Sequence, residues 1–199
     1  GTIKGNLYGG ANSSVVFGIS VVNIGEAAIK EYYGAQASTT YTTGDILIEG
    51  QIFGAGESMK VGVAEYDFDE RSVSNTTDIN IDGEGYNGEG QKTLVFKESV
   101  FASGNASSPV QNGTITIRNL GSATSPMEFV SLQRAGEVKI DNSVLHLSGT
   151  TDSTAKFSDV FFSLNILDKL TIKNNTTLYL DNGANTVKEF ASMYGDDAN

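Results

Sequence analysis

The chain is first defined by what it lacks. Cysteine is absent from its 199 residues, which excludes disulfides, thiolate metal sites and cysteine nucleophiles. Tryptophan is absent too, proline occurs twice, and His146 is the only histidine. No apolar run approaches the roughly 20 residues of a membrane-spanning helix. The chain opens inside an extended segment without a signal-peptide pattern, so we expect a mature or excised fragment.

Basic residues are also scarce. Lysine and arginine total 13 against 24 aspartates and glutamates, which gives a net charge of −11. An acidic surface repels nucleic acid and anionic lipid, so we expect neither as a partner, and no direct membrane insertion. A hydrophobic content of 39% is typical of a folded protein. The length predicts a single domain over residues 1–199.

One short word recurs along the chain: an apolar residue, any residue, isoleucine, a charged residue, then glycine or asparagine. Its starts are separated by 33, 36, 23 and 32 residues (79−46, 115−79, 138−115 and 170−138). The copies span residues 46–50, 79–83, 115–119, 138–142 and 170–174, with a clipped copy at 3–5. Repetition of one unit is typical of stacked architectures.

Most of the sequence alternates with a period of two, which predicts strands. Helix is expected only at 154–167 and 187–194. The predicted strands include 27–33, 46–53, 93–102, 137–147 and 169–180. We therefore predict an all-β solenoid with irregular loops, in which the apolar positions of each word point inward and stack on their counterparts. Glycine or asparagine would supply a left-handed corner, where asparagine side chains hydrogen-bond to one another. The alternative is a two-sheet β-sandwich, in which the word only marks strand ends.

Residues 170–183, together with 137–149 and 112–121, resemble the passenger segments of bacterial autotransporter (type V secreted) adhesins. The resemblance implies a right-handed parallel β-helix without a cofactor, displayed at the cell surface and outer membrane-anchored through parts absent from this sequence. It also implies a non-enzymatic role in virulence and cell adhesion, with a protein or glycan partner on another cell surface, or self-association. The absence of cysteine fits export. Uneven spacing and the stretches 64–71 and 154–167 depart from a regular member.

Two further functions compete with this one: a carbohydrate-binding β-sandwich module, and a polysaccharide-cleaving β-helix enzyme. The enzyme would use Glu65, Asp67 and Asp69, which share one strand face with neighbours about 6.6 Å apart. Paired carboxylates serve glycoside hydrolases. A solvated acidic face explains the same pattern.

Asp78, Asn80, Asp82 and Glu89, with an intervening glycine, match the calcium-loop pattern D-x-[DN]-x-[DN]-G-x₅-E. Isoleucines fill the positions between the first three, which favours a strand and turn over a metal site. His146 lies in a predicted strand without a nucleophile motif, which indicates a structural histidine. We expect binding contacts in the loops at 82–91, 104–113 and 149–158.

Overall fold

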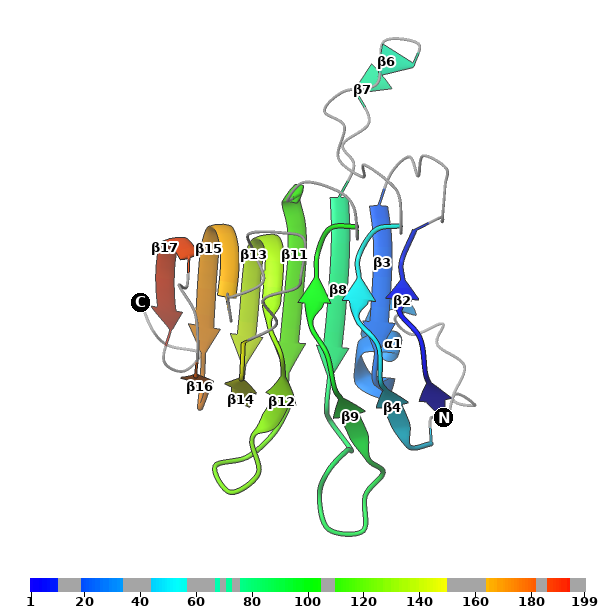
Figure 1. The fold of residues 1–199 in the computed structure, drawn as a ribbon, viewed down its shortest axis with the longest axis vertical. Helices are drawn as coiled ribbons and strands as arrows, with labels where there is room; N and C mark the ends of the chain where they lie inside the picture. The colour runs from blue at the N-terminus through cyan, green and yellow to red at the C-terminus, as the bar shows by residue number, and fades with distance from the viewer. Residues whose placement is uncertain are drawn as a thin grey trace.

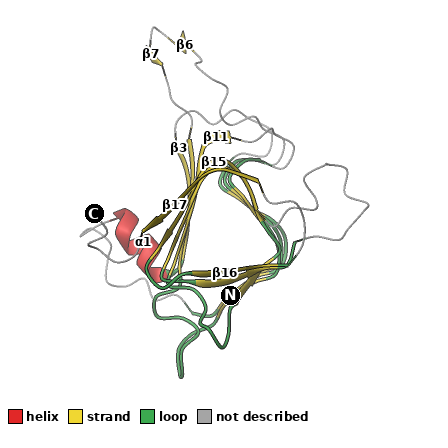
Figure 2. Ribbon diagram, turned by 90° about the vertical axis from the view of Figure 1, so that its left-hand side faces the viewer, coloured by secondary structure: helices red, strands yellow, loops and turns green. Residues whose placement is uncertain are grey.

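The computed structural model is built almost entirely of β-strands in parallel sheets, with one short helix. It describes residues 1–10, 19–33, 44–56, 67–68, 71–72, 76–104, 110–149, 164–181 and 186–193. Figure 1 shows the strands side by side in rows, and Figure 2 shows them on three sides of a triangle. We call these sides the first, second and third walls.

The first wall consists of two three-stranded parallel sheets that lie next to each other. One sheet contains β1 (Thr2–Ile3), β4 (Ile46–Ile48) and β9 (Leu94–Phe96). The other contains β12 (Met127–Phe129), β14 (Val144–Leu147) and β16 (Thr177–Leu180).

One nine-stranded sheet bends to form the other two walls. β2 (Leu7–Tyr8), β5 (Ile52–Phe53) and β10 (Val100–Phe101) lie in the second wall. β3 (Ile19–Ile24), β8 (Thr76–Asp82) and β11 (Val110–Arg118) lie in the third. The long strands β13 (Leu132–Asp141), β15 (Leu164–Lys173) and β17 (Thr186–Met193) run through both. β13 turns between the walls at Arg134, where φ is 55°.

The chain passes through the three walls in the same order on every turn. Successive passes are β1–β2–β3, β4–β5–β8, β9–β10–β11, β12–β13, β14–β15 and β16–β17. Strands of one wall therefore pair in parallel with strands of the neighbouring passes, except between β9 and β12 in the first wall. A short antiparallel pair, β6 (Asp67–Phe68) with β7 (Arg71–Ser72), stands apart from the walls.

The core lies inside the triangle and is made of stacked copies of the repeated word. In the third wall Ile79, Ile115, Val138 and Leu170 occupy one register position on successive strands. All four are at least 96% buried. The predicted stacking of the words is confirmed for these four copies. Burying an aliphatic side chain of this size stabilises the fold by about 1.5–3 kcal/mol, so the ladder is a major source of stability.

The first copy of the word does not belong to this ladder, contrary to our expectation. Ile48 pairs with Ile3 and with Phe96 in the first wall. The third-wall ladder begins instead at Val22 and Ile24, which pair with Ile79 and Ile81. The sequence 22–25 lacks the charged residue of the word, because glycine follows the second apolar position directly.

Asparagine forms the corners after three of the words. Asn119, Asn142 and Asn174 have φ values of 53°, 44° and 50°, the left-handed region that asparagine tolerates better than most residues. The Nδ2 of Asn142 donates to Oδ1 of Asn119 over 2.9 Å. The Nδ2 of Asn119 donates to Oδ1 of Asp82 over 3.0 Å. The predicted hydrogen bonding between corner asparagines is confirmed for Asn142 and Asn119, with Asp82 as the terminal acceptor, whereas Asn174 donates to Asp141.

Glycine at a word end serves a different purpose. A Cβ at Gly83 would lie 2.4 Å from the backbone oxygen of Asn119, and one at Gly50 would lie 2.4 Å from that of Gly5. Neither glycine has a positive φ among the described backbone angles. Close approach of the neighbouring strand, and not handedness, excludes a side chain at both corners.

The strand expected at 27–33 was wrong, because α1 (Glu26–Tyr33) is a helix. Gly25, with φ 97°, ends β3. Glu26 then lies in the first helical turn, where a negative charge is favoured, and its Oε1 contacts the Nζ of Lys30 at 2.9 Å. Ala28 is 3% exposed, and the helix packs against β3 and β8.

The two expected helices also need correction. Residues 186–193 form β17, which pairs in parallel with β15; strand pairing at this edge overrides the local helical spacing. Of the stretch 154–167, only 164–167 is described, and it belongs to β15. The long predicted strands at 46–53, 93–102, 137–147 and 169–180 each divide in two, because the corner interrupts them.

At Asn119, the side-chain hydrogen bonds and the left-handed backbone should each contribute separately to the free energy of unfolding. Asn119→Gly keeps the left-handed backbone but removes the hydrogen bonds to Asp82 and Asn142, so we expect a loss of about 1–3 kcal/mol in unfolding free energy. Asn119→Ala should cost about 1 kcal/mol more, because alanine disfavours positive φ. Urea unfolding measures both. Asn175→Ala, at an exposed position after the corner, is the control and should change little. Equal losses for alanine and glycine would contradict the backbone contribution.

Candidate functional site

The first wall is interrupted between β9 and β12. No ladder pairs these two among the described strands, although they are neighbours. At one end they stay together: the N–H of Val130 reaches the carbonyl of Glu98 at 3.5 Å, and the rings of Phe96 and Phe129 stack at 4.7 Å. At the other end a groove lined by residues of both strands lies between them, and we call this opening the wedge.

Pro126 explains why the wedge opens at this end. Continuing the parallel register from the Val130–Glu98 bond would place the nitrogen of Pro126 opposite the carbonyl of Leu94. Proline has no N–H to donate. The side chain of Asn87 takes the place of the missing strand: its Nδ2 donates to the Leu94 carbonyl over 3.0 Å, and its Oδ1 accepts from the Leu94 N–H over 2.9 Å. One primary amide thus caps both backbone groups of Leu94.

A groove of about 530 Å³ lies in this opening. Its sides come from the connections between β8 and β9 and between β11 and β12. Its buried lining includes Leu94, Phe96 and Met127. The exposed polar side chains that line it are Asn87, Gln91, Thr93, Ser122, Ser125 and Glu128. The volume falls within the range of about 300–1,000 Å³ typical of ligand pockets.

Both connections are held by their own hydrogen bonds. The N–H of Gly88 donates to Oε1 of Gln91 over 2.9 Å, and Asn87 bonds through its backbone N–H to the carbonyl of Lys92 over 2.8 Å. The other connection is closed by backbone bonds of 2.9 and 3.1 Å between Ser122 and Ser125. The groove is therefore preformed.

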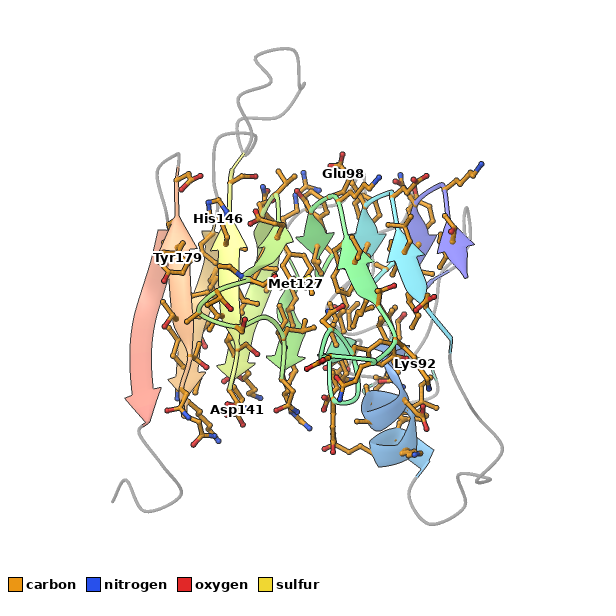
Figure 3. All side chains as sticks on the ribbon, turned by 90° about the horizontal axis from the view of Figure 1, so that it is seen from below. Lys92, Glu98, Met127, Asp141, His146 and Tyr179 are labelled. Carbon is orange, nitrogen blue, oxygen red and sulfur yellow. The ribbon has the colours of Figure 1, made fainter. Side chains whose placement is uncertain are left out.

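A row of outward side chains runs from the groove across the second sheet of the first wall. Glu128, His146 and Tyr179 are register partners on β12, β14 and β16. Figure 3 labels the last two on neighbouring strands, with Met127 on the strand beyond. The Nδ1 of His146 lies 2.7 Å from a carboxylate oxygen of Glu128, and its Nε2 lies 2.7 Å from one of Asp181. The Tyr179 ring meets the imidazole edge-on at 6.5 Å.

Two carboxylates thus hold one imidazole on both nitrogens. The hydrogen bond to Glu128, followed by that to Asp181, raises the pKa of His146 above its ordinary value. With both nitrogens engaged by carboxylates, the ring is arranged to carry a positive charge, and not to activate a nucleophile. His146 on β14 therefore links Glu128 on β12 to Asp181 at the end of β16, which fits the structural role predicted for it.

The residues of the calcium pattern lie along a strand. Asp78, Asn80 and Asp82 all belong to β8, whereas a calcium loop curls its ligands around one ion. Asn80 donates to Oδ1 of Asn23 over 3.0 Å, and Asp82 accepts from Asn119. Burial raises the pKa of Asp78. Glu89 is exposed in the following connection. Within the described ranges, no three histidine or acidic side chains form a group suited to a metal ion.

The carboxylates proposed for a hydrolase fall largely outside the described residues. This holds for Glu65 and Asp69, and for Asp67 only the backbone is described, in β6. Of the loops expected to carry contacts, 82–91 lines the groove. Residues 105–109 and 150–158 of the other two lie outside the described ranges.

Sequence reasoning missed Asn87, Pro126 and Glu128. Pro126 is one of only two prolines in the chain, and a proline directly before a strand was an available signal of an interrupted ladder. Asn87 carries no comparable signal, because its partner Leu94 is identified only by the fold.

Comparison with protein-family models, with curated proteins and with solved structures finds no match to this chain. In the part of the chain that is described, no helix has the length and apolarity needed to cross a membrane.

The His146 cluster predicts a pH-dependent contribution to stability. A raised folded-state pKa stabilises the fold fully below the unfolded value of about 6.5, and this contribution is lost as pH rises through the folded pKa. The difference in unfolding free energy between wild type and His146→Gln should follow that course, and should remain below about 1 kcal/mol because the pairs are partly exposed.

The single histidine allows the pKa to be read directly from one imidazole signal in an NMR titration. Glu128→Gln should lower the pKa of His146 toward its ordinary value, because Glu128 is the main cause of the shift. Glu137→Gln, which affects the pair with Lys139 in the third wall, is the control. An unchanged pKa in Glu128→Gln would contradict the cluster.

Proposed function

We propose that the chain is a right-handed parallel β-helix from a bacterial cell-surface adhesin, a passenger segment that displays a binding surface. The observation that carries the fold is the residue-for-residue parallel register of the repeated words in the third wall. Strand connections of this kind are right-handed in about 98% of cases. The uneven word spacing is taken up by the connections between walls, as in a β-helix with irregular loops.

Parallel pairing favours this fold over the β-sandwich, which is built from antiparallel hairpins. It therefore also weakens the proposal of a carbohydrate-binding sandwich module. A polysaccharide-cleaving β-helix enzyme shares the proposed fold, and no arrangement of the described residues specifically favours it. We take the preformed groove and the adjoining Glu128–His146–Tyr179 row as the contact surface of the proposed adhesin.

The proposed fold predicts which engineered cysteines can pair. Thr116 and Lys139 are register partners on β11 and β13. Adjacent strands lie about 4.8 Å apart, within the Cα range of a disulfide. Because the chain has no native cysteine, Thr116→Cys with Lys139→Cys should oxidise to a disulfide that speeds migration in non-reducing electrophoresis.

The matched control combines Thr116→Cys with Thr171→Cys, one strand further along the same register. These positions lie about 9.6 Å apart and should stay reduced in the folded protein. Efficient crosslinking of the control pair, or failure of the first pair, would refute the proposed stack.

The proposed function predicts adhesion by the isolated chain. Fluorescent beads carrying the folded protein should bind to a panel of eukaryotic and bacterial cells, counted by flow cytometry. Beads with the heat-unfolded chain control for charge, since both carry the same acidic sequence. Binding no greater than that of these control beads on every cell type would overturn the adhesin proposal. Release of reducing sugar from polysaccharides, without adhesion, would favour the enzyme.

A further inference from the structure

The edge of β9 presents a hydrogen-bond donor and an acceptor that a single peptide-like group can satisfy together. The N–H and carbonyl of Leu94 point toward the groove and are both bonded by the amide of Asn87. This amide offers one donor and one acceptor in the geometry of a peptide group. Asn87 thus imitates the backbone of a neighbouring strand at a place where Pro126 prevents a real one from pairing.

The groove provides space beside this edge. The groove between β9 and β12 has a volume of about 530 Å³ and is lined by Leu94 and Met127 from the two strands, so a peptide that displaces the Asn87 side chain reaches Leu94 from it. Its buried floor of Leu94, Phe96 and Met127 is apolar, while Gln91 and Ser122 at its sides are exposed. Alternate side chains of a bound strand would then face the floor and the solvent.

We propose that this groove binds the end of an extended peptide from another protein, which adds to the β9 edge in place of the Asn87 amide. Such strand addition takes its affinity from main-chain hydrogen bonds. A peptide backbone satisfies the Leu94 N–H and carbonyl together, as the Asn87 amide does. A peptide also repeats this donor and acceptor pair along its length, which a saccharide hydroxyl does not, so the edge favours a peptide over a glycan.

Charge indicates which peptides fit best. The whole chain carries a net charge of −11, so the field around the groove is acidic even though Glu128, which lines the groove, also pairs with His146. A peptide with basic residues therefore meets a complementary field, and one with acidic residues is repelled. The inference rests on the proposed function, because it names the partner class of the same contact surface.

The test measures fluorescence anisotropy of a labelled hexapeptide, KTVTVK, with the full chain. Wild type should bind it weakly, because Asn87 competes for the same edge. Asn87→Gly removes the competing amide and suits the positive φ of 59° at this position. Affinity should rise about tenfold, as expected for one or two hydrogen bonds no longer in competition.

Asn87→Asp is the matched variant. It keeps an acceptor for the Leu94 N–H but loses the donor to the Leu94 carbonyl, so its affinity should lie between those of wild type and Asn87→Gly. ETVTVE should bind more weakly than KTVTVK. A peptide N-methylated at alternate residues, which cannot donate along that edge, should not bind.

The location is checked by the amide signal of Leu94 in a ¹⁵N correlation spectrum, which should shift on addition of KTVTVK. Binding without that shift would place the peptide elsewhere, such as on an outermost strand of the stack, and would overturn the proposal. No binding to wild type or to a folded Asn87→Gly would overturn it as well. Binding of maltohexaose that displaces the peptide would replace the peptide with a glycan. Cell adhesion of the beads that survives the loss of peptide binding would leave the proposed function standing while this inference fails.

Discussion

The in-register stacking of inward aliphatic side chains is the constraint on which the rest of the structure depends. Ile81, Ile117 and Ile140 lie on successive strands at one register position, and each is at most 1% exposed. A slip of one residue would turn every such side chain outward, because side chains alternate between faces along a strand. The ladder therefore fixes the register of the whole third wall. Once that register is fixed, each corner must fall at the same height in every pass.

The corners carry the second constraint. A chain that turns at the same place in every pass brings its corner residues into contact, so their side chains must be compatible with one another as well as with the turn. Asparagine meets both needs, since it tolerates a positive φ and both donates and accepts hydrogen bonds. Asp82 accepts from Asn119 and from the backbone N–H of Glu84, so the ladder ends in an acceptor. This explains why Asp82 of the apparent calcium motif is buried, because the neighbours that cover it are themselves corner residues.

The sequence predicts the parts of the structure that repeat, and fails where a single tertiary contact decides. The inward positions of the words at 79–83, 115–119, 138–142 and 170–174 follow from periodicity, and the left-handed corner at Asn119 follows from the residue type. Two predictions of secondary structure were wrong for the same reason: contacts with neighbouring strands outweighed the local sequence pattern. Residues 26–33 form a helix against β3 and β8, and residues 186–193 form a strand on the edge of β15. The contacts with β8 and β15 come from residues distant in the sequence, so the local spacing of residues does not reveal them.

The groove illustrates the same limit for function. Asn87 and Leu94 are seven residues apart, within reach of any motif search, yet nothing about their sequence marks them as partners. Their relation arises because Pro126, from the next pass, cannot complete the ladder at Leu94. A fold built from repetition satisfies its backbone groups by default, so a non-repeating residue has to be compensated by another. The break between β9 and β12 contains both Pro126, which interrupts the repeat, and Asn87, which compensates for it. In the proposed complex, the backbone of the bound peptide takes over the hydrogen bonds that the Asn87 side chain makes with Leu94.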